Sequence, residues 1–180
     1  MRWIAFAVLA ALSLSAAAGT LDINLSNDTL EAKYDAPAGA ANWTFGGLYN
    51  RDDKNYAFNV GLLATGDGSA GKSRVSGGLG GKIYAVHFPG EDVAALALGG
   101  EIRWFPGNDW FALGGYAFYA PKVVTFLDGV NFYDTGLRAE VEVFRNSFAY
   151  LGYRWTRAEL EGGSQPYVDK GGFIGLMVKF

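Results

Sequence analysis

Residues 172–180 read GFIGLMVKF, a stretch in which a large apolar residue stands at every second position and an aromatic residue at the last one. Successive side chains of a β-strand point to opposite faces, so alternate residues share a face. The stretch therefore predicts a β-strand with one continuous apolar face. That face carries Ile174, Leu176, Val178 and Phe180.

The same alternation recurs along the chain and is sharpest between residues 133 and 143. One face of this segment is apolar, with Tyr133, Leu137, Ala139, Val141 and Val143. The opposite face carries Asp134, Gly136, Arg138, Glu140 and Glu142. Residues 56–64, 94–104 and 149–155 alternate in a similar way, so the sequence predicts an all-β fold.

Composition helps to choose among all-β folds. The chain is 50% hydrophobic and 16% aromatic and contains 26 glycines, but beyond residue 18 it has no apolar run long enough for a membrane helix. A soluble β-sandwich also alternates, but it seldom combines so many glycines with so many large aromatic residues. Apolar residues spread through alternating segments are typical of a transmembrane antiparallel up-and-down β-barrel, which is the fold we expect.

Turn signals divide the chain into nine candidate strands, whereas single-chain bacterial barrels have an even number. Within residues 21–34 the apolar positions change from odd to even numbers at Ser26-Asn27-Asp28, which reads as a bulge or a turn. We expect eight strands behind a non-spanning segment 21–34; the alternative is that this segment splits and gives ten. The candidate strands are 21–34, 41–50, 54–64, 73–87, 92–105, 110–120, 131–144, 148–160 and 168–180.

Counting strands back from Phe180 assigns a side to each connection of the expected barrel. With both ends of the barrel in the periplasm, the outer loops are residues 161–166, 121–130, 89–91 and 52–53. The inner connections are residues 145–147, 106–109 and 65–72. The stretch 65–72 superficially resembles a phosphate-binding loop, but it lacks the glycine spacing and the following helix, so we predict a flexible connection.

The N-terminal segment has the layout of a secretory signal peptide. A basic residue, Arg2, precedes an apolar run over residues 4–14 and small residues up to Ala18. We expect cleavage after Ala18, with Ala17 as the alternative, so that residues 1–18 are removed and residues 19–180 form one barrel domain. The apolar run is too short to span a membrane as a helix. Because the chain has no cysteine, neither a lipid-anchored N-terminus nor a disulfide framework is available.

The charge balance and the ligand inventory limit the classes of partner. Removal of the signal leaves 14 of the 15 basic residues against 18 acidic ones, a formal net charge of −4. Basic residues do not cluster, which argues against a nucleic-acid partner. One histidine and no cysteine leave mainly oxygen ligands, so neither a metal site nor a cofactor is expected.

Two resemblances indicate a location. The final strand and its terminal aromatic residue are similar to the C-terminal signal of bacterial outer-membrane barrels, which implies recognition by the barrel-assembly machinery. The chain also contains, in this order, NLSNDTL (24–30), GLGGK (78–82), LALGGE (96–101), YAPKVV (119–124) and GYR (152–154). In order and spacing these motifs resemble the YfaZ-type outer-membrane proteins of Gram-negative bacteria, over essentially the whole mature chain. The resemblance implies an integral outer-membrane barrel in contact with lipid, and it brings no catalytic residues.

Charged side chains fall on the face that would line the lumen. Since an eight-stranded barrel only just accommodates its side chains, we expect these charges to pair across strands and fill the interior; the alternative is that they are selectivity groups of a pore. The lumen-facing candidates are Lys82, Glu101, Arg103, Asp134, Arg138, Glu140, Glu142, Arg154 and Lys179. Aromatic residues near the predicted strand ends are expected to anchor the barrel at the membrane interface, namely Trp43, Trp104, Trp110, Tyr119, Tyr153 and Trp155.

These patterns favour a non-enzymatic outer-membrane barrel that is structural or binds a surface partner through its outer loops. The alternative is a small channel for ions or small solutes. A second alternative is a lipid-modifying enzyme that uses His87, with Glu91 or Glu101 as the partner of the imidazole. Proline stands at position 89, so the His-x-Ser pattern of barrel lipid A deacylases is absent.

Overall fold

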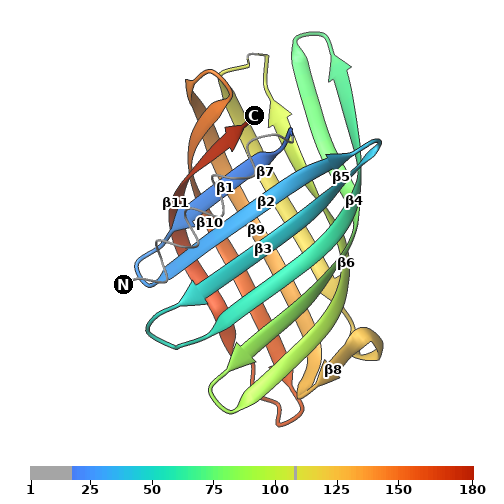
Figure 1. Cartoon of the computed structure of the whole chain (residues 1–180), viewed down its shortest axis with the longest axis vertical. Coiled ribbons are helices and arrows are strands. Elements are labelled where there is room, and N and C mark those ends of the chain that lie inside the picture. Colours follow the sequence, from blue (N-terminus) through green and yellow to red (C-terminus); the bar gives the residue numbers. More distant parts are fainter. Residues whose placement is uncertain (1–17, 108) are drawn as a thin grey trace.

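The alternating segments pair into one antiparallel sheet that closes on itself in a computed structural model, which describes residues 18–107 and 109–180 (Figure 1). In these ranges the sheet has eleven strands, ten of which form the barrel wall. Each wall strand pairs with its sequence neighbours, and β1 pairs with β11 to close the barrel. The strands are β1 Thr20–Leu25, β2 Thr29–Ala38, β3 Ala41–Asn50, β4 Tyr56–Ala70, β5 Ser73–Phe88, β6 Glu91–Phe105, β7 Phe111–Ala120, β8 Thr125–Leu127, β9 Gly129–Phe144, β10 Ser147–Leu160 and β11 Tyr167–Lys179.

The expectation of eight strands is wrong, and the alternative of ten is confirmed. Residues 21–34 split into β1 and β2, and the change of parity at residues 26–28 marks the turn of a hairpin. Ser26 N donates a hydrogen bond of 2.9 Å to Thr29 O across this turn. β1 pairs with β2 on one side and with β11 on the other, so the barrel could not close without β1.

The eleventh strand, β8, lies in the predicted outer loop 121–130. A short 3-10 turn, η1 (Lys122–Val124), follows β7, and β8 then pairs with Val93–Ala95 near the start of β6. β7 pairs with β6 only farther along, over Leu98–Trp104, and with β9 on its other side. The short strand therefore covers the part of β6 that β7 does not reach.

The barrel has two distinct ends. At the terminal end, Gly19 N donates to Phe180 O at 2.9 Å, and the turns between β2 and β3, β4 and β5, β6 and β7, and β9 and β10 lie beside this contact. At the loop end lie the connections 26–28, 51–55, 89–90, 121–128 and 161–166. The prediction of a flexible connection at residues 65–72 is wrong: β4 runs to Ala70 and β5 begins at Ser73, so most of these residues belong to a strand. Figure 1 shows this hairpin, in light green, at the end of the barrel where the C-terminus lies.

The outer face of the barrel is apolar on every wall strand. Outward alternate positions carry large exposed side chains, for example Ile23, Leu30, Phe45, Phe58, Ile83, Leu98, Leu113, Leu137, Leu151 and Ile174, one from each wall strand in chain order. The six aromatic residues predicted at the membrane interface are exposed as well. In the described ranges, no helix is long and apolar enough to cross a membrane.

The inward positions form two buried apolar clusters with polar side chains between them. The loop-end cluster consists of Leu48, Ala57, Leu63, Tyr84, Val86, Phe88, Val93, Ala95, Ala97, Phe118, Ala120, Phe132, Ala158, Leu160 and Val168. The terminal-end cluster consists of Phe105, Ala112, Phe148, Tyr150, Phe173 and Met177. The predicted signal peptide lies outside the described residues except for Ala18, so its cleavage stays a prediction.

Candidate functional site in the barrel interior

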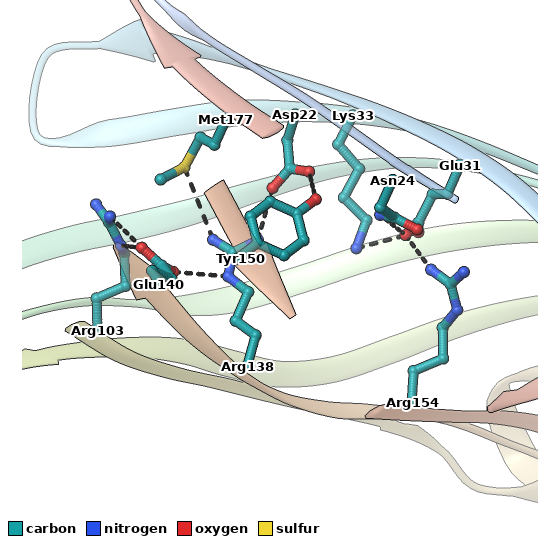
Figure 2. A network of polar contacts seen from close by, with 10 residues as sticks. All are labelled: Asp22, Asn24, Glu31, Lys33, Arg103, Arg138, Glu140, Tyr150, Arg154 and Met177. Carbon is teal, nitrogen blue, oxygen red and sulfur yellow. Dashed lines mark hydrogen bonds and ion pairs between the residues drawn. The ribbon is translucent and has the colours of Figure 1, made fainter. Parts of the chain in front are cut away.

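Arg154 is the centre of a first charge network between the two apolar clusters (Figure 2). Its side chain is buried; Nη1 donates to Glu31 Oε2, and Nε donates to Asp169 Oδ2. Glu31 also accepts a hydrogen bond of 2.7 Å from Asn24 Nδ2 and pairs with Lys33 Nζ at 3.0 Å. The network, which we name the Arg154 network, therefore holds two cations and two carboxylates and is neutral.

Arg138 is the centre of a second network nearer the terminal end (Figure 2). Its Nη1 donates to Asp22 Oδ2 at 2.6 Å, and its Nε donates to Glu140 Oε1 at 2.7 Å. Arg103 Nε donates to the other oxygen of Glu140 at 2.7 Å, and the Tyr150 hydroxyl donates to Asp22. This Arg138 network also contains two cations and two carboxylates, and Glu140 has no exposed surface.

Both networks join strands that are not neighbours in the sheet. Arg154 on β10 reaches Glu31 on β2, with β11 and β1 between them, and Arg138 on β9 reaches Asp22 on β1. The ion pairs therefore tie together separate parts of the wall. Removing ions from water is costly unless each charge is paired and hydrogen-bonded. Each charge in the two networks is paired, although Arg154 Nη2 has no hydrogen-bond partner among the described residues.

The structure brings four of the predicted lumen-facing residues together in these networks, namely Arg103, Arg138, Glu140 and Arg154. Asp134 lies apart from them and accepts hydrogen bonds of 2.8 Å from the Tyr84 hydroxyl and the Thr156 hydroxyl. Glu142 lies at the rim, where its Oε1 accepts a hydrogen bond of 3.1 Å from the backbone N of Asn146 in the β9–β10 turn. Its carboxylate thus supports a turn instead of filling the lumen.

The sequence prediction missed the partners on the other side of the interior. Asp22, Glu31 and Lys33 lie in the segment that was expected not to span, and Asp169 lies near a register shift in the β10–β11 ladder. A usable signal was present, since Asp22 and Asn24 alternate with Leu21 and Ile23. A strand with one polar and one apolar face would have placed these residues in the wall.

Lys82 and Glu101 line a polar cavity of about 280 Å³ in the interior, beside both networks. The cavity extends toward the terminal end, where Thr20, Asp67 and Lys179 line it. In the other direction, the loop-end cluster fills the barrel with almost fully buried apolar side chains. The interior therefore combines a packed apolar half with a charged half that contains open space.

His87 lies on the outer face near the loop end. Its Nδ1 is 2.6 Å from Asp92 Oδ1, and its ring stacks on Tyr56 with the centroids 4.7 Å apart. The expectation that Glu91 or Glu101 would be its partner is therefore corrected to Asp92, because the register of the β5–β6 hairpin places Asp92 opposite His87. In the described part of the chain, His87 forms no hydrogen bond with a hydroxyl group. Across the same described residues, no group of three or more His, Cys, Asp or Glu side chains is arranged so that it could hold a metal ion.

Comparison with known proteins agrees with the fold and with the motifs. The sequence profile of a family described as YfaZ precursor matches residues 1–180, the full length of the chain. None of the curated proteins matches it. The predicted family resemblance is confirmed: the chain belongs to the YfaZ precursor family.

Proposed function

We propose that the mature protein is an integral outer-membrane β-barrel with a closed interior, which acts structurally or binds a surface partner through its loop-end connections. The observation that carries this proposal is the inverted distribution of side chains. Every wall strand exposes large apolar residues on the outer face, whereas charged residues lie inside. A contiguous apolar belt of this kind suits contact with lipid and would be a liability in water.

The lengths of the connections support an orientation. Three of the turns at the terminal end have only two residues between the strands, namely residues 39–40, 71–72 and 145–146. The loop end carries the longer connections 51–55, 121–128 and 161–166. Outer-membrane barrels have short periplasmic turns and longer outer loops, so we place the terminal end in the periplasm and the loop end outside the cell.

We favour a closed barrel over the channel alternative because of what fills the loop end. Phe118, Phe132 and Leu160 are at most 1% exposed, and they belong to a cluster drawn from most of the wall. Ions would have to pass between these apolar side chains, and the two neutral networks offer no uncompensated charge to attract them. The geometry at His87, which hydrogen-bonds to Asp92 and to no hydroxyl among the described residues, gives the enzyme alternative no comparable support.

The test begins with membrane-extracted protein run on a detergent gel with and without boiling. We expect a heat-dependent shift in mobility, because a barrel closed by hydrogen bonds resists detergent until it is heated. The same folded protein, reconstituted in planar bilayers, is expected to give no conductance steps. Release of the protein into the soluble periplasm would overturn the membrane assignment. Regular conductance steps from folded protein would instead favour the channel.

A further inference from the structure

Five charged side chains that line the interior cavity stand outside both networks: Lys82 on β5, Lys179 on β11, Asp35 on β2, Asp67 on β4 and Glu101 on β6. Among the residues that the structure describes, none of these five forms an ion pair. Lys82 is only 5% exposed. A buried ammonium without a carboxylate partner is costly, and a bound anionic group that faces it offsets the cost.

The position of Lys82 is constrained by its surroundings. Gly61 lies opposite Lys82 in the β4–β5 ladder, and a Cβ added at Gly61 would lie 2.5 Å from Lys82 Cγ. Glycine at that position therefore leaves the space that the lysine stem occupies. At the other end of the side chain, Nζ lies 4.2 Å from the centroid of the Phe118 ring, which stabilises the ammonium through a cation–π contact. The packing thus holds a positive charge at the border between the apolar half and the cavity.

We propose that this cavity binds a small zwitterion, a molecule that carries both an ammonium and a carboxylate. The carboxylate would face Lys82, and the ammonium would face Asp35 and Glu101. A simple anion would leave the two acidic side chains unpaired, and a simple cation would leave Lys82 unpaired. A ligand with both charges compensates Lys82 and the two acidic side chains together.

The size of the cavity limits the ligand. Its volume of about 280 Å³ lies just below the range of roughly 300–1,000 Å³ that drug-sized ligands occupy, so the site suits a molecule the size of one amino acid. The hydroxyl-bearing residues Thr44 and Tyr116 also line it and add groups for hydrogen bonding. Binding requires only the folded barrel. The cavity extends toward the terminal end, so in the orientation proposed above, on which this point rests, the ligand would enter from the periplasm.

The test uses four probes with the same number of carbon atoms: α-aminobutyrate, γ-aminobutyrate, butyrate and butylamine. Each is titrated into isotope-labelled protein refolded in detergent micelles, and backbone amide signals are followed by NMR. We expect at least one of the two zwitterions to cause saturable shifts at Lys82 and Glu101, with a dissociation constant at least about tenfold below those of butyrate and butylamine. Equal responses to all four probes, a preference for a singly charged probe, or no response would overturn the proposal.

Variants connect the response to the cavity. Lys82→Met keeps the length of the stem and removes the charge, so it should abolish the saturable shifts, whereas Lys82→Arg should retain them. Glu101→Gln should weaken binding by removing a partner of the ligand ammonium. Lys170→Met, at an exposed position on β11, is the matched control and should bind as the wild type does.

Folding of each variant is checked by its heat-dependent mobility on the same samples. Wild-type binding by folded Lys82→Met would overturn the proposal, and so would loss of binding in folded Lys82→Arg. A wild-type protein that shows the mobility shift but binds no zwitterion would refute the ligand site alone. A protein that shows no barrel at all would refute the proposed function instead.

Discussion

The two halves of the barrel interior are closed by different means. At the loop end, buried apolar side chains from most wall strands fill the space. In the other half, between this cluster and the smaller terminal-end cluster, the Arg154 and Arg138 networks cross the interior, and a cavity remains beside them. Apolar side chains adapt to one another and can fill a space completely, whereas ion pairs require particular distances and directions. The difference suggests that the apolar half seals the barrel and that the charged half can receive a polar ligand.

The largest loss of stability is expected from Arg154→Met in the charged half. This change leaves Asp169 without its ion-pair partner and Glu31 with only Lys33. Removing one member of a buried ion pair costs about 3–5 kcal/mol, so we expect a loss of that size in the free energy of unfolding. Urea unfolding of the refolded protein in detergent micelles measures it.

The control for this prediction is Arg51→Met, because Arg51 pairs with Asp28 on the exposed surface of the loop end. An exposed pair contributes at most about 1 kcal/mol. If both arginine variants lost the same free energy of unfolding, the stability of the charged half would not depend on its buried ion pairs. The double variant Arg154→Met with Asp169→Asn should recover part of the loss, since it no longer buries that unpaired carboxylate.

The next largest effect is expected in the apolar half. Leu160 is 1% exposed within the loop-end cluster, so Leu160→Ala removes buried methyl groups and leaves a cavity. We expect a loss of about 2–3 kcal/mol in the free energy of unfolding, measured by the same urea titration. Val123→Ala, at an exposed position in η1, is the control and should change stability by less than about 0.5 kcal/mol. A Leu160→Ala loss as small as that of Val123→Ala would mean that the loop end is loosely packed.

Much of this two-part interior was accessible from the alternation of residues. The segment 133–143 was assigned correctly because every charged residue in it lies on one face and every large apolar residue on the other. Arg138, Glu140 and Arg154 could be placed inside for the same reason. Alternation is local information, since the strand geometry alone determines which way each side chain points.

The partners of those charges could not be found in this way. Arg154 and Glu31 are 123 residues apart, and they meet only because β1 pairs with β11 and closes the barrel. Once residues 21–34 were taken as a non-spanning segment, that closure and both networks were out of reach. The β4–β5 hairpin was misjudged for a different reason. Its residues 65–72 are mostly glycine and small polar residues, so they carry no apolar face that would reveal a strand.

A smaller effect is expected at Gly99, where the two halves meet. A Cβ added there would lie 2.0 Å from Ala117 O and 2.7 Å from Phe118 Cα, both of which are backbone atoms of β7. Because the backbone must move to accept the methyl group, Gly99→Ala should cost about 1–2 kcal/mol. Gly66→Ala is the matched control, since nothing lies within 4 Å of its added Cβ. Equal stability of the two variants would show that β6 and β7 are not tightly apposed at this position.

The smallest effect is expected at His87, which lies outside both halves of the interior. Its side chain is 36% exposed, and its pair with Asp92 is on the outer surface, so His87→Ala should change the free energy of unfolding by less than about 1 kcal/mol. Membranes containing wild-type or His87→Ala protein should have identical lipid A and phospholipid profiles by mass spectrometry. Lipid acyl chains altered only in the presence of the histidine would restore the enzyme alternative. They would also place the reactive site on the lipid-facing surface, away from the charged interior, and the comparison between the two halves would then no longer describe where this protein acts.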